Sequence, residues 1–264
     1  MRCLIDADVL IYEAAFGGEF KDEETGEKII RPFEDVANLF DQKIREIHEA
    51  CWATERAWLF LTGNEFLLRL ENKERWWEDK PPLAFIPNFR FEVANTVAYK
   101  STRSAKPYHY RNLLAYVHAQ YRPRIAWGME ADDLICITQQ RHLESNDTII
   151  CTRDKDLRAC PGWHYGWECH NQEGFGPVEV DQLGEISLSA NKKKVNGTGL
   201  KFFYSQMITG DKVDTIPGLP LGGPVMACKV LEDCTTEVDM YRAVKALYEA
   251  KGLSDDYFID RDWE

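Results

Sequence analysis

Acidic side chains follow three short apolar runs of the sequence, and carboxylates placed in this way could bind metal ions. Asp6 comes after RCLI, Asp132 comes after RIAW within GMEADDLICI, and Asp154 comes after TIIC. If the runs are parallel strands, their carboxyl ends meet at one edge of a sheet and bring these acids together. The candidate metal ligands are Asp6, Glu130, Asp132, Asp133, Asp154 and Asp156, with Asp211 and Asp214 farther along the chain and Asp8 as a weaker candidate.

Converging carboxylates repel one another unless a cation neutralises them, and hard oxygen ligands favour Mg²⁺ or Mn²⁺. Two such ions about 4 Å apart suit phosphodiester hydrolysis, because one activates the attacking water and the other stabilises the leaving oxygen. A single acidic cluster at a strand end is often only a turn former or a helix cap. Several convergent clusters favour the metal interpretation.

The run GMEADDLICI predicts a helix whose acids belong to its inward face. Helical spacing places Glu130 and Asp133 on the same side as Leu134 and Ile137. We expect this side to face the core, with the carboxylates held there by metal. The alternative is that acids in the first helical turn cap free amides and favour the positive end of the helix dipole.

A basic segment supplies the positive charge that an anionic substrate needs. The chain has 32 Lys and Arg against 44 Asp and Glu, a net charge of −12, which argues on average against a polyanionic partner. From residue 90 to 124, however, seven basic residues accompany one acid. Lys100 and Arg103 lie three residues apart and could contact one scissile phosphate. We assign DNA contact to Tyr99, Lys106 and Arg111, with a solvated basic face as the alternative.

The apolar runs predict an α/β fold. Buried strands are expected at 2–5, 57–61, 124–127 and 148–151, with helices at 34–52, at 107–121 and from 130, and a polar hairpin at 19–33. Strands separated by helices predict a mainly parallel sheet flanked by helices. We expect a nuclease core at 1–196 and a helical subdomain at 197–264. In that subdomain a loop with Gly218, Gly222 and Gly223 could expose backbone amides to a DNA phosphate.

The eight cysteines contain no C-x-x-C pair, and several lie in apolar runs. Cys160, His164, Cys169 and His170 could form a zinc site, but their spacing matches no known ligand frame, so we expect buried free thiols in a reducing cytoplasm. The first residues include Asp6 and Asp8 before any apolar core of useful length, so we expect no signal peptide, and no run is long enough to predict a membrane span.

Five motifs together resemble the flap endonuclease and 5′-nuclease superfamily, over residues 2 to about 235. They are LIDAD, YKSTR, GMEADDLI, TRDKDL and GDKVDTIPGLPLGGPVMACKVL, in the family's order and spacing. The sequence looks most like 5′ to 3′ exonucleases of tailed phages and the 5′-nuclease domain of bacterial DNA polymerase I.

The resemblance implies a PIN-like core, a helical arch around 64–110, and a helix-hairpin-helix that often binds a potassium ion. It also implies a Mg²⁺-dependent or Mn²⁺-dependent nuclease, with two ions, in the cytoplasm of a bacterial host. The substrates would be DNA with 5′ ends, flaps or nicks, or an RNA/DNA hybrid. Lys100 and Arg103 match the family's active-site cations, and the eight acids from Asp6 to Asp214 named first match its metal ligands.

The sequence departs from the family pattern at two places. Many members have an aspartate directly after the second strand, where this chain has Thr62, Gly63 and Asn64. The hairpin loop carries Leu221 and Val225, where small, basic or hydroxyl residues are usual. Two alternative functions therefore stay open: a PIN-like ribonuclease, and a DNA-binding module that has lost catalysis.

Overall fold

A computed structural model describes residues 1–75, 84, 86–89, 105–169, 172–211, 216–254 and 258. Tyr99, Lys100, Arg103 and Asp214 lie outside these residues, as does part of the predicted arch at 64–110. Contacts divide the chain into two compact units. The first comprises the described residues of 1–88, 104–154 and 163–178, and the second includes 155–162 and the described residues from 179 onward.

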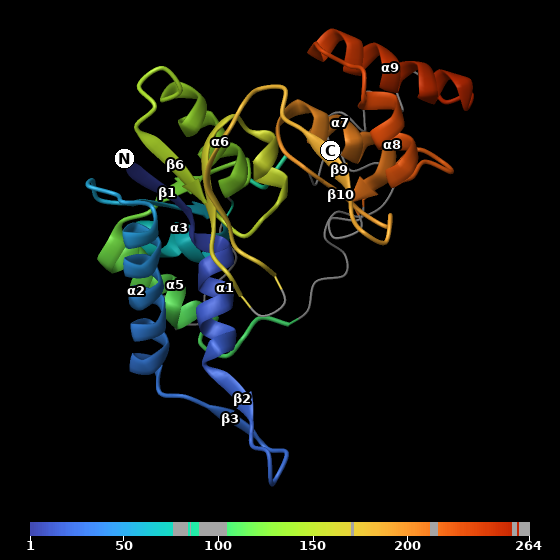
Figure 1. Cartoon of the computed structure of the whole chain (residues 1–264). Helices are drawn as coiled ribbons and strands as arrows, with labels where there is room; N and C mark the ends of the chain where they lie inside the picture. The colour runs from blue at the N-terminus through green and yellow to red at the C-terminus, as the bar shows by residue number, and fades with distance from the viewer. Residues whose placement is uncertain are drawn as a thin grey trace. The chain divides into compact units, whose positions relative to one another are not determined.

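A six-stranded sheet forms the centre of the first unit (Figure 1). Its order is β5 (Arg124–Ala126), β4 (Trp58–Thr62), β1 (Arg2–Asp6), β6 (Thr148–Cys151), β7 (Gly162–Gly166) and β8 (Phe175–Val180). The pairings from β5 through β7 are all parallel. The carboxyl ends of β1, β4, β5 and β6 therefore lie along one edge, as the acid spacing predicted.

Helices cover both faces of the sheet, which explains why its central strands are apolar throughout. Successive strand side chains point to opposite faces. Cys3, Ile5, Leu61 and Cys151 pack into a core with α1 (Ala7–Gly17), α2 (Phe33–Ala50) and α5 (Tyr110–Tyr121). Leu4, Phe60 and Ile150 are also buried, and α6 (Ala131–Arg141) contacts β1, β4 and β6.

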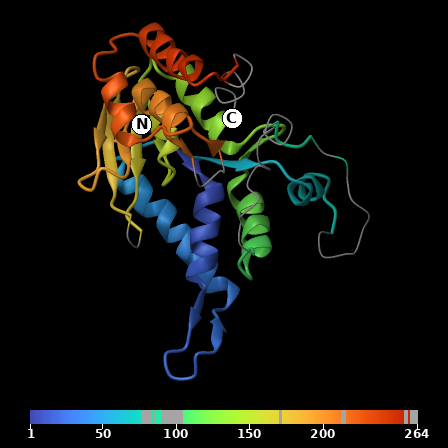
Figure 2. The ribbon, with the colours of Figure 1, turned by 90° about the vertical axis from the view of Figure 1, so that its right-hand side faces the viewer.

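Shorter elements extend from this core. Helix α3 (Glu65–Glu71) follows β4, and a hairpin of β2 (Glu19–Lys21) and β3 (Lys28–Ile30) connects α1 to α2. Both views show the hairpin extending past the ends of α1 and α2 (Figures 1 and 2).

The second unit has its own apolar core, built mainly by helices α7 (Gly199–Thr209), α8 (Pro224–Leu231) and α9 (Glu237–Ala250). Ile208, Ala227, Leu231 and Val244 are fully buried there. The unit also contains the 3₁₀ turn η1 (Asp156–Ala159) and two antiparallel pairs, β9 (Ile186–Leu188) with β10 (Val195–Gly197) and β11 (Gly210–Asp211) with β12 (Ile216–Pro217).

The predicted α/β class and mainly parallel sheet are confirmed, and all four predicted strands are present. The division into units differs from the predicted boundary at residue 197, because 155–162 and 179–196 group with the C-terminal helices. Helix α1 and the strands β7 to β10 are also present, although the sequence pattern did not predict them.

Candidate metal centre

Asp6 lies at the junction of β1 and α1 and is 1% exposed. One of its carboxylate oxygens accepts the amide of Val9 at 3.2 Å, which caps α1, and the other accepts the hydroxyl of Thr152 at 2.8 Å. Burial and the nearby carboxylates of Asp8 and Asp154 raise the pKa of Asp6 to about 7, although these two hydrogen bonds oppose the shift. A buried carboxylate with acidic neighbours is a group that a cation would stabilise.

Asp132 occupies the first turn of α6 and joins the same group of acids. Its pKa is raised well above the ordinary value by burial and then by the charges of Asp6, Asp154, Glu130 and Asp8. The convergence predicted for the ends of β1, β5 and β6 is thus present within the first unit. We call Asp6, Asp8, Asp132 and Asp154 the carboxylate centre.

The carboxylate centre has the right donor type for Mg²⁺ or Mn²⁺, but its oxygens stand farther apart than the ligands of a bound ion. Among the described residues, no three carboxylates place oxygens within 4.8 Å of one another. Octahedral ligands of Mg²⁺ lie about 2.1 Å from the ion, so binding would require these side chains to close inward. A bound ion would offset the repulsion between these acids.

Asp8 is held by a residue that the sequence did not suggest, Thr62. Its carboxylate accepts the backbone amide of Thr62 at 2.8 Å, and the hydroxyl of Thr62 accepts the amide of Ala131 at 3.0 Å. Thr62 therefore links the start of α1 and the end of β4 to the start of α6. Its backbone amide holds Asp8, and its hydroxyl holds the backbone of the helical turn that carries Asp132.

The inward helical face predicted for GMEADDLICI is wrong. The buried side of α6 is formed by Ala131, Ile135, Thr138 and Gln139, whereas Ile137 is exposed. The buried stripe passes through Ala131 and Ile135, about 100° around the helix from the predicted stripe through Leu134 and Ile137. Glu130 is buried as the N-cap that precedes the first turn.

Asp133 has the capping role that was considered as the alternative. Its carboxylate accepts the backbone amide of Glu130 at 2.9 Å, and Glu130 completes the reciprocal capping box. Glu130 itself is buried and contributes to the raised pKa of Asp132. Metal ligation by Asp133 stays a prediction.

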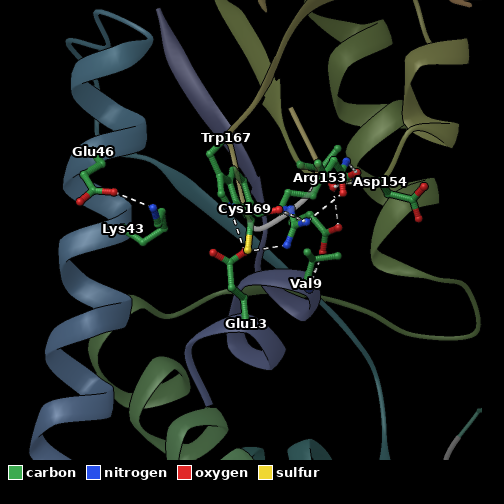
Figure 3. A network of polar contacts seen from close by, with 11 residues as sticks. Val9, Glu13, Lys43, Glu46, Arg153, Asp154, Trp167 and Cys169 are labelled. Atoms are coloured by element: carbon green, nitrogen blue, oxygen red, sulfur yellow. Dashed lines mark hydrogen bonds and ion pairs between the residues drawn. The ribbon is translucent and has the colours of Figure 1, made fainter. Parts of the chain in front are cut away.

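A polar network holds the backbone beside Asp154 (Figure 3). The Arg153 guanidinium donates to Glu13 at 3.4 Å and to the side-chain oxygen of Gln172 at 2.9 Å, while the Gln172 amide donates to the Arg153 carbonyl at 2.7 Å. The Trp167 indole also donates to Glu13 at 2.7 Å. On the other side of Arg153, the Thr152 hydroxyl accepts the Asp154 amide at 3.0 Å. The network thus orders the backbone from Thr152 to Asp154.

Two further candidate ligands, Asp156 and Asp211, belong to the second unit and meet there around a lysine. The Lys155 ammonium lies 2.8 Å from an Asp156 oxygen and 3.2 Å from an Asp211 oxygen. These carboxylates raise the lysine pKa although burial opposes the shift. Gln206 also donates to Asp156 at 2.6 Å. Lys155 was not among the residues predicted from the sequence, and metal ligation by Asp156 and Asp211 stays a prediction.

The remaining described candidates lie on the surfaces of the two units. Lys106 and Arg111 are exposed, with Lys106 4.3 Å from the centre of the Tyr110 ring. Gly218 and Gly222 have structural reasons to be glycine, because an added Cβ would lie 2.3 Å from the Gly210 nitrogen or 2.4 Å from the Ile208 oxygen. DNA contact by these residues and by Gly223 stays a prediction.

The same fold occurs in solved structures of phage nucleases. A 5′-exonuclease of bacteriophage T5 with bound zinc superposes with a TM-score of 0.59 at 11% identity, covering 98% of this chain and 87% of that one. A flap endonuclease of the same phage, in a pseudo-enzyme–product complex with DNA and metal ions, gives a TM-score of 0.54 at 11% identity, covering 98% and 86%. This chain has the 5′-nuclease fold. The structural neighbours therefore confirm the fold that the resemblance implied.

Sequence comparison finds partial matches. DNA polymerase I of Deinococcus radiodurans is 28% identical over 167 residues, and that of Rhizobium leguminosarum is 30% identical over 145 residues. The matches cover 61% and 52% of this chain but only 16% and 13% of the polymerases. No protein-family model matches the sequence. Among the described residues, no helix is both long and apolar enough to cross a membrane.

Within this 5′-nuclease fold, the position after β4 has no room for the aspartate that many family members carry there. A Cβ on Gly63 would lie 2.5 Å from the Trp127 ring and 2.7 Å from the Ala126 carbonyl oxygen. The Gly63 amide also donates to that carbonyl at 2.7 Å, which holds the two strands in close contact. Glycine at this position is therefore a consequence of local packing.

We expect Gly63→Ala to lower the free energy of unfolding by about 1–3 kcal/mol, because the added methyl group must displace Trp127 or the backbone. Urea denaturation of the two proteins measures the difference. Gly17→Ala, at the end of α1, is the control for an added methyl group, since a Cβ there makes only an ordinary contact of 3.6 Å with Leu39. Equal stability of the Gly63 variant and the unaltered chain would contradict the packing explanation.

Proposed function

We propose that this chain is a divalent-metal-dependent 5′-nuclease that hydrolyses phosphodiesters in DNA carrying 5′ ends, flaps or nicks. The observation that carries the proposal is the carboxylate centre, in which burial and the charges of neighbouring acids raise the pKa of both Asp6 and Asp132. Burying ionised carboxylates together costs free energy in a metal-free protein. Binding of Mg²⁺ or Mn²⁺ would offset that cost, because these ions prefer carboxylate oxygens. The nuclease fold provides independent support.

Asp6, Asp132 and Asp154 would hold the ion, with Asp8 and Glu130 adding negative charge nearby. A bound divalent ion lowers the pKa of a water molecule and stabilises the negative charge that develops on phosphate oxygens. The chain's own contribution is to keep the carboxylates ordered before substrate arrives. Asp6 is fixed by two hydrogen bonds and Asp8 by Thr62.

Other predicted residues would complete the reaction. Lys100 and Arg103 are proposed to contact the scissile phosphate, on the strength of their spacing and the family motif. A second ion, for which Asp156, Asp211 and Asp214 are the sequence candidates, would have to compete with the Lys155 ammonium that now neutralises two of these acids.

The loop between α7 and α8 is proposed to bind the DNA backbone. Gly223 is the N-cap of α8 and no side chain caps this helix. The amides of the first helical turn could therefore donate to a phosphate, and the positive end of the helix dipole would favour that anion. Leu221 and Val225 are exposed beside this turn and provide apolar contact area. A potassium ion in the loop remains part of the same proposal.

The direct test uses purified protein with end-labelled 5′-flap, nicked and blunt DNA. Cleavage is expected with Mg²⁺ or Mn²⁺, with 5′-phosphorylated products, and none is expected after chelation. Product lengths distinguish trimming from an end from cutting at a branch. Intact substrates at every metal concentration would refute the proposal.

The same assay separates the two alternatives. A PIN-like ribonuclease would cleave matched RNA in preference to DNA, because selection would depend on the 2′-hydroxyl. A catalytically inactive DNA-binding module would shift DNA mobility with no metal-dependent cleavage. Amides at the start of α8 would bind an RNA phosphate as well as a DNA phosphate, so the comparison must include both.

We expect Glu13→Gln to lower kcat about tenfold with KM almost unchanged, because Glu13 orients the backbone at Asp154 without touching substrate. The substitution keeps the shape of the side chain and removes the negative charge of the carboxylate to which Arg153 and Trp167 donate hydrogen bonds. Steady-state flap cleavage at several Mg²⁺ concentrations measures the effect. Glu49→Gln, at the exposed end of α2, is the control for loss of one negative charge. A rise in KM alone would contradict a positioning role.

A further inference from the structure

Three cysteine side chains from distant parts of the sequence meet in the core of the first unit. Cys3 lies on β1, Cys151 lies on the adjacent strand β6, and Cys51 follows the last turn of α2. They are 0%, 0% and 1% exposed. Their sulfur atoms all lie within 4.8 Å of one another, and those of Cys51 and Cys151 are 3.7 Å apart. We call these residues the thiol triad.

The triangle of sulfur atoms has the size that a metal ion requires. With one side of 3.7 Å and no side above 4.8 Å, a point equidistant from the three atoms lies no more than about 2.6 Å from each. Zinc–thiolate bonds are about 2.3 Å long, so a shift of a few tenths of an ångström brings every sulfur to bonding distance. The backbone positions on β1, β6 and α2 already provide this arrangement.

One thiol of the triad is prepared to lose its proton. Hydrogen bonds from the thiols of Cys151 and Cys51 lower the pKa of Cys3 to about 4, although burial opposes the shift. Burial raises the pKa of Cys151, and the hydrogen bond with Cys3 together with burial raises the pKa of Cys51 although the hydrogen bond with Cys151 opposes the shift. These two thiols therefore keep their protons until a stronger acid replaces them. A metal ion is such an acid, because coordinated thiols are deprotonated and metal affinity rises as protons leave.

From this geometry we propose that the thiol triad is a binding site for one soft, thiophilic cation of the Zn²⁺ class. Sulfur ligands distinguish it from the carboxylate centre, since Mg²⁺ and Mn²⁺ prefer oxygen. Two thiolates balance the charge of a divalent ion, and the apolar surroundings disfavour further charge. The site would fasten the end of α2 to the two central strands.

The site does not depend on the nuclease proposal. Cys3, however, precedes Asp6 on β1, and Cys151 ends β6 directly before Thr152, so occupation would stiffen the strands that carry the carboxylate centre. Binding to the folded chain alone would also raise its stability by mass action.

The experiment titrates reduced, chelator-treated full-length protein with Cd²⁺ in the presence of excess Mg²⁺. Cadmium reports thiolate ligation through ultraviolet charge-transfer absorption, and magnesium occupies oxygen sites. We expect the absorption to saturate at one equivalent of Cd²⁺. Cys51→Ser and Cys151→Ser should each weaken binding at least tenfold, whereas Cys228→Ser, on α8 of the second unit, should leave it unchanged.

No saturating absorption, or equal loss in the Cys228 variant, would overturn the proposal. The unaltered chain gives a second test that needs no folded variant, because X-ray absorption of its cadmium complex counts the ligands. Three sulfur neighbours support the triad, and oxygen or nitrogen neighbours alone refute it. A Cys51–Cys151 disulfide in protein prepared under reducing conditions would also refute it. Retention of cadmium binding in Asp132→Asn would show that this site is independent of the carboxylate centre.

Discussion

Asp132→Asn is expected to lower the rate of 5′-flap cleavage by about 10³-fold while the affinity for DNA stays the same or rises. Asp132 belongs to the group of buried acids whose charges act on one another, so its loss removes a ligand and weakens ion binding. The neutral amide nearly preserves the side-chain volume. Removing a negative charge also reduces repulsion of the DNA backbone, so binding and turnover should change independently.

Single-turnover cleavage in Mg²⁺ and DNA binding in Ca²⁺ or chelator measure the two effects separately. Asp147→Asn is the matched control, because Asp147 immediately precedes β6 at the end opposite the carboxylate centre. It makes an exposed ion pair with His142 at 2.9 Å, so its neutralisation should leave cleavage unchanged. Normal turnover in the Asp132 variant, or a parallel loss of DNA binding, would show that these acids do not form the metal site.

The second large effect is a loss of stability with rising pH in the metal-free protein. The pKa of Asp6 is raised to about 7 in the folded chain from an ordinary value of 3.8. Below pH 3.8 both folded and unfolded chains hold this proton, and between pH 4 and 7 only the folded chain keeps it. The free energy of unfolding therefore falls as pH rises through this window, by at most about 4 kcal/mol for this group. Above pH 7 the contribution levels off.

Thermal or urea unfolding at pH 5 and pH 8 tests this sign, with chelator in one series and Mg²⁺ in the other. Mg²⁺ binds the deprotonated carboxylates and should restore stability at pH 8. Asp132→Asn should stabilise the chelated protein at pH 8 and flatten its pH dependence, since one repelling charge is gone. Asp147→Asn should keep the slope of the unaltered chain. A metal-free protein that is more stable at pH 8 than at pH 5 would contradict the description of the site.

Local sequence was enough to locate the strands that carry the acids. RCLI and TIIC are short, largely apolar runs, and in the structure they are adjacent parallel strands buried on both faces. The proximity of Asp6 and Asp154 could then be predicted, because a parallel sheet places the carboxyl ends of its strands along one edge. Helix phase was less secure. The buried stripe of α6 lies one residue away from the predicted one, so that Ile137 is exposed and Ala131 and Ile135 are buried.

Several residues around the acids gave no local signal. Thr62, Glu13 and Gln172 are ordinary polar residues in the sequence, and their roles come from partners far along the chain. Thr62 contacts Asp8, 54 residues away, and Glu13 contacts Arg153, 140 residues away. The role of Lys155 could not be predicted for a different reason. In the sequence it is only a lysine between two aspartates, and its second partner, Asp211, is brought beside it by the fold.

The sequence by itself determined the fold class, the order of the strands along the chain and the identity of the acids that end them. These features depend on the apolar content of short segments and on one rule of sheet geometry. Only the tertiary structure decided that Asp133 caps α6, why Gly63 cannot carry a side chain, and that Cys3, Cys51 and Cys151 form one cluster. Those outcomes depend on where a helix begins and on distances between residues far apart in the chain, and both are set by the packing of the whole core.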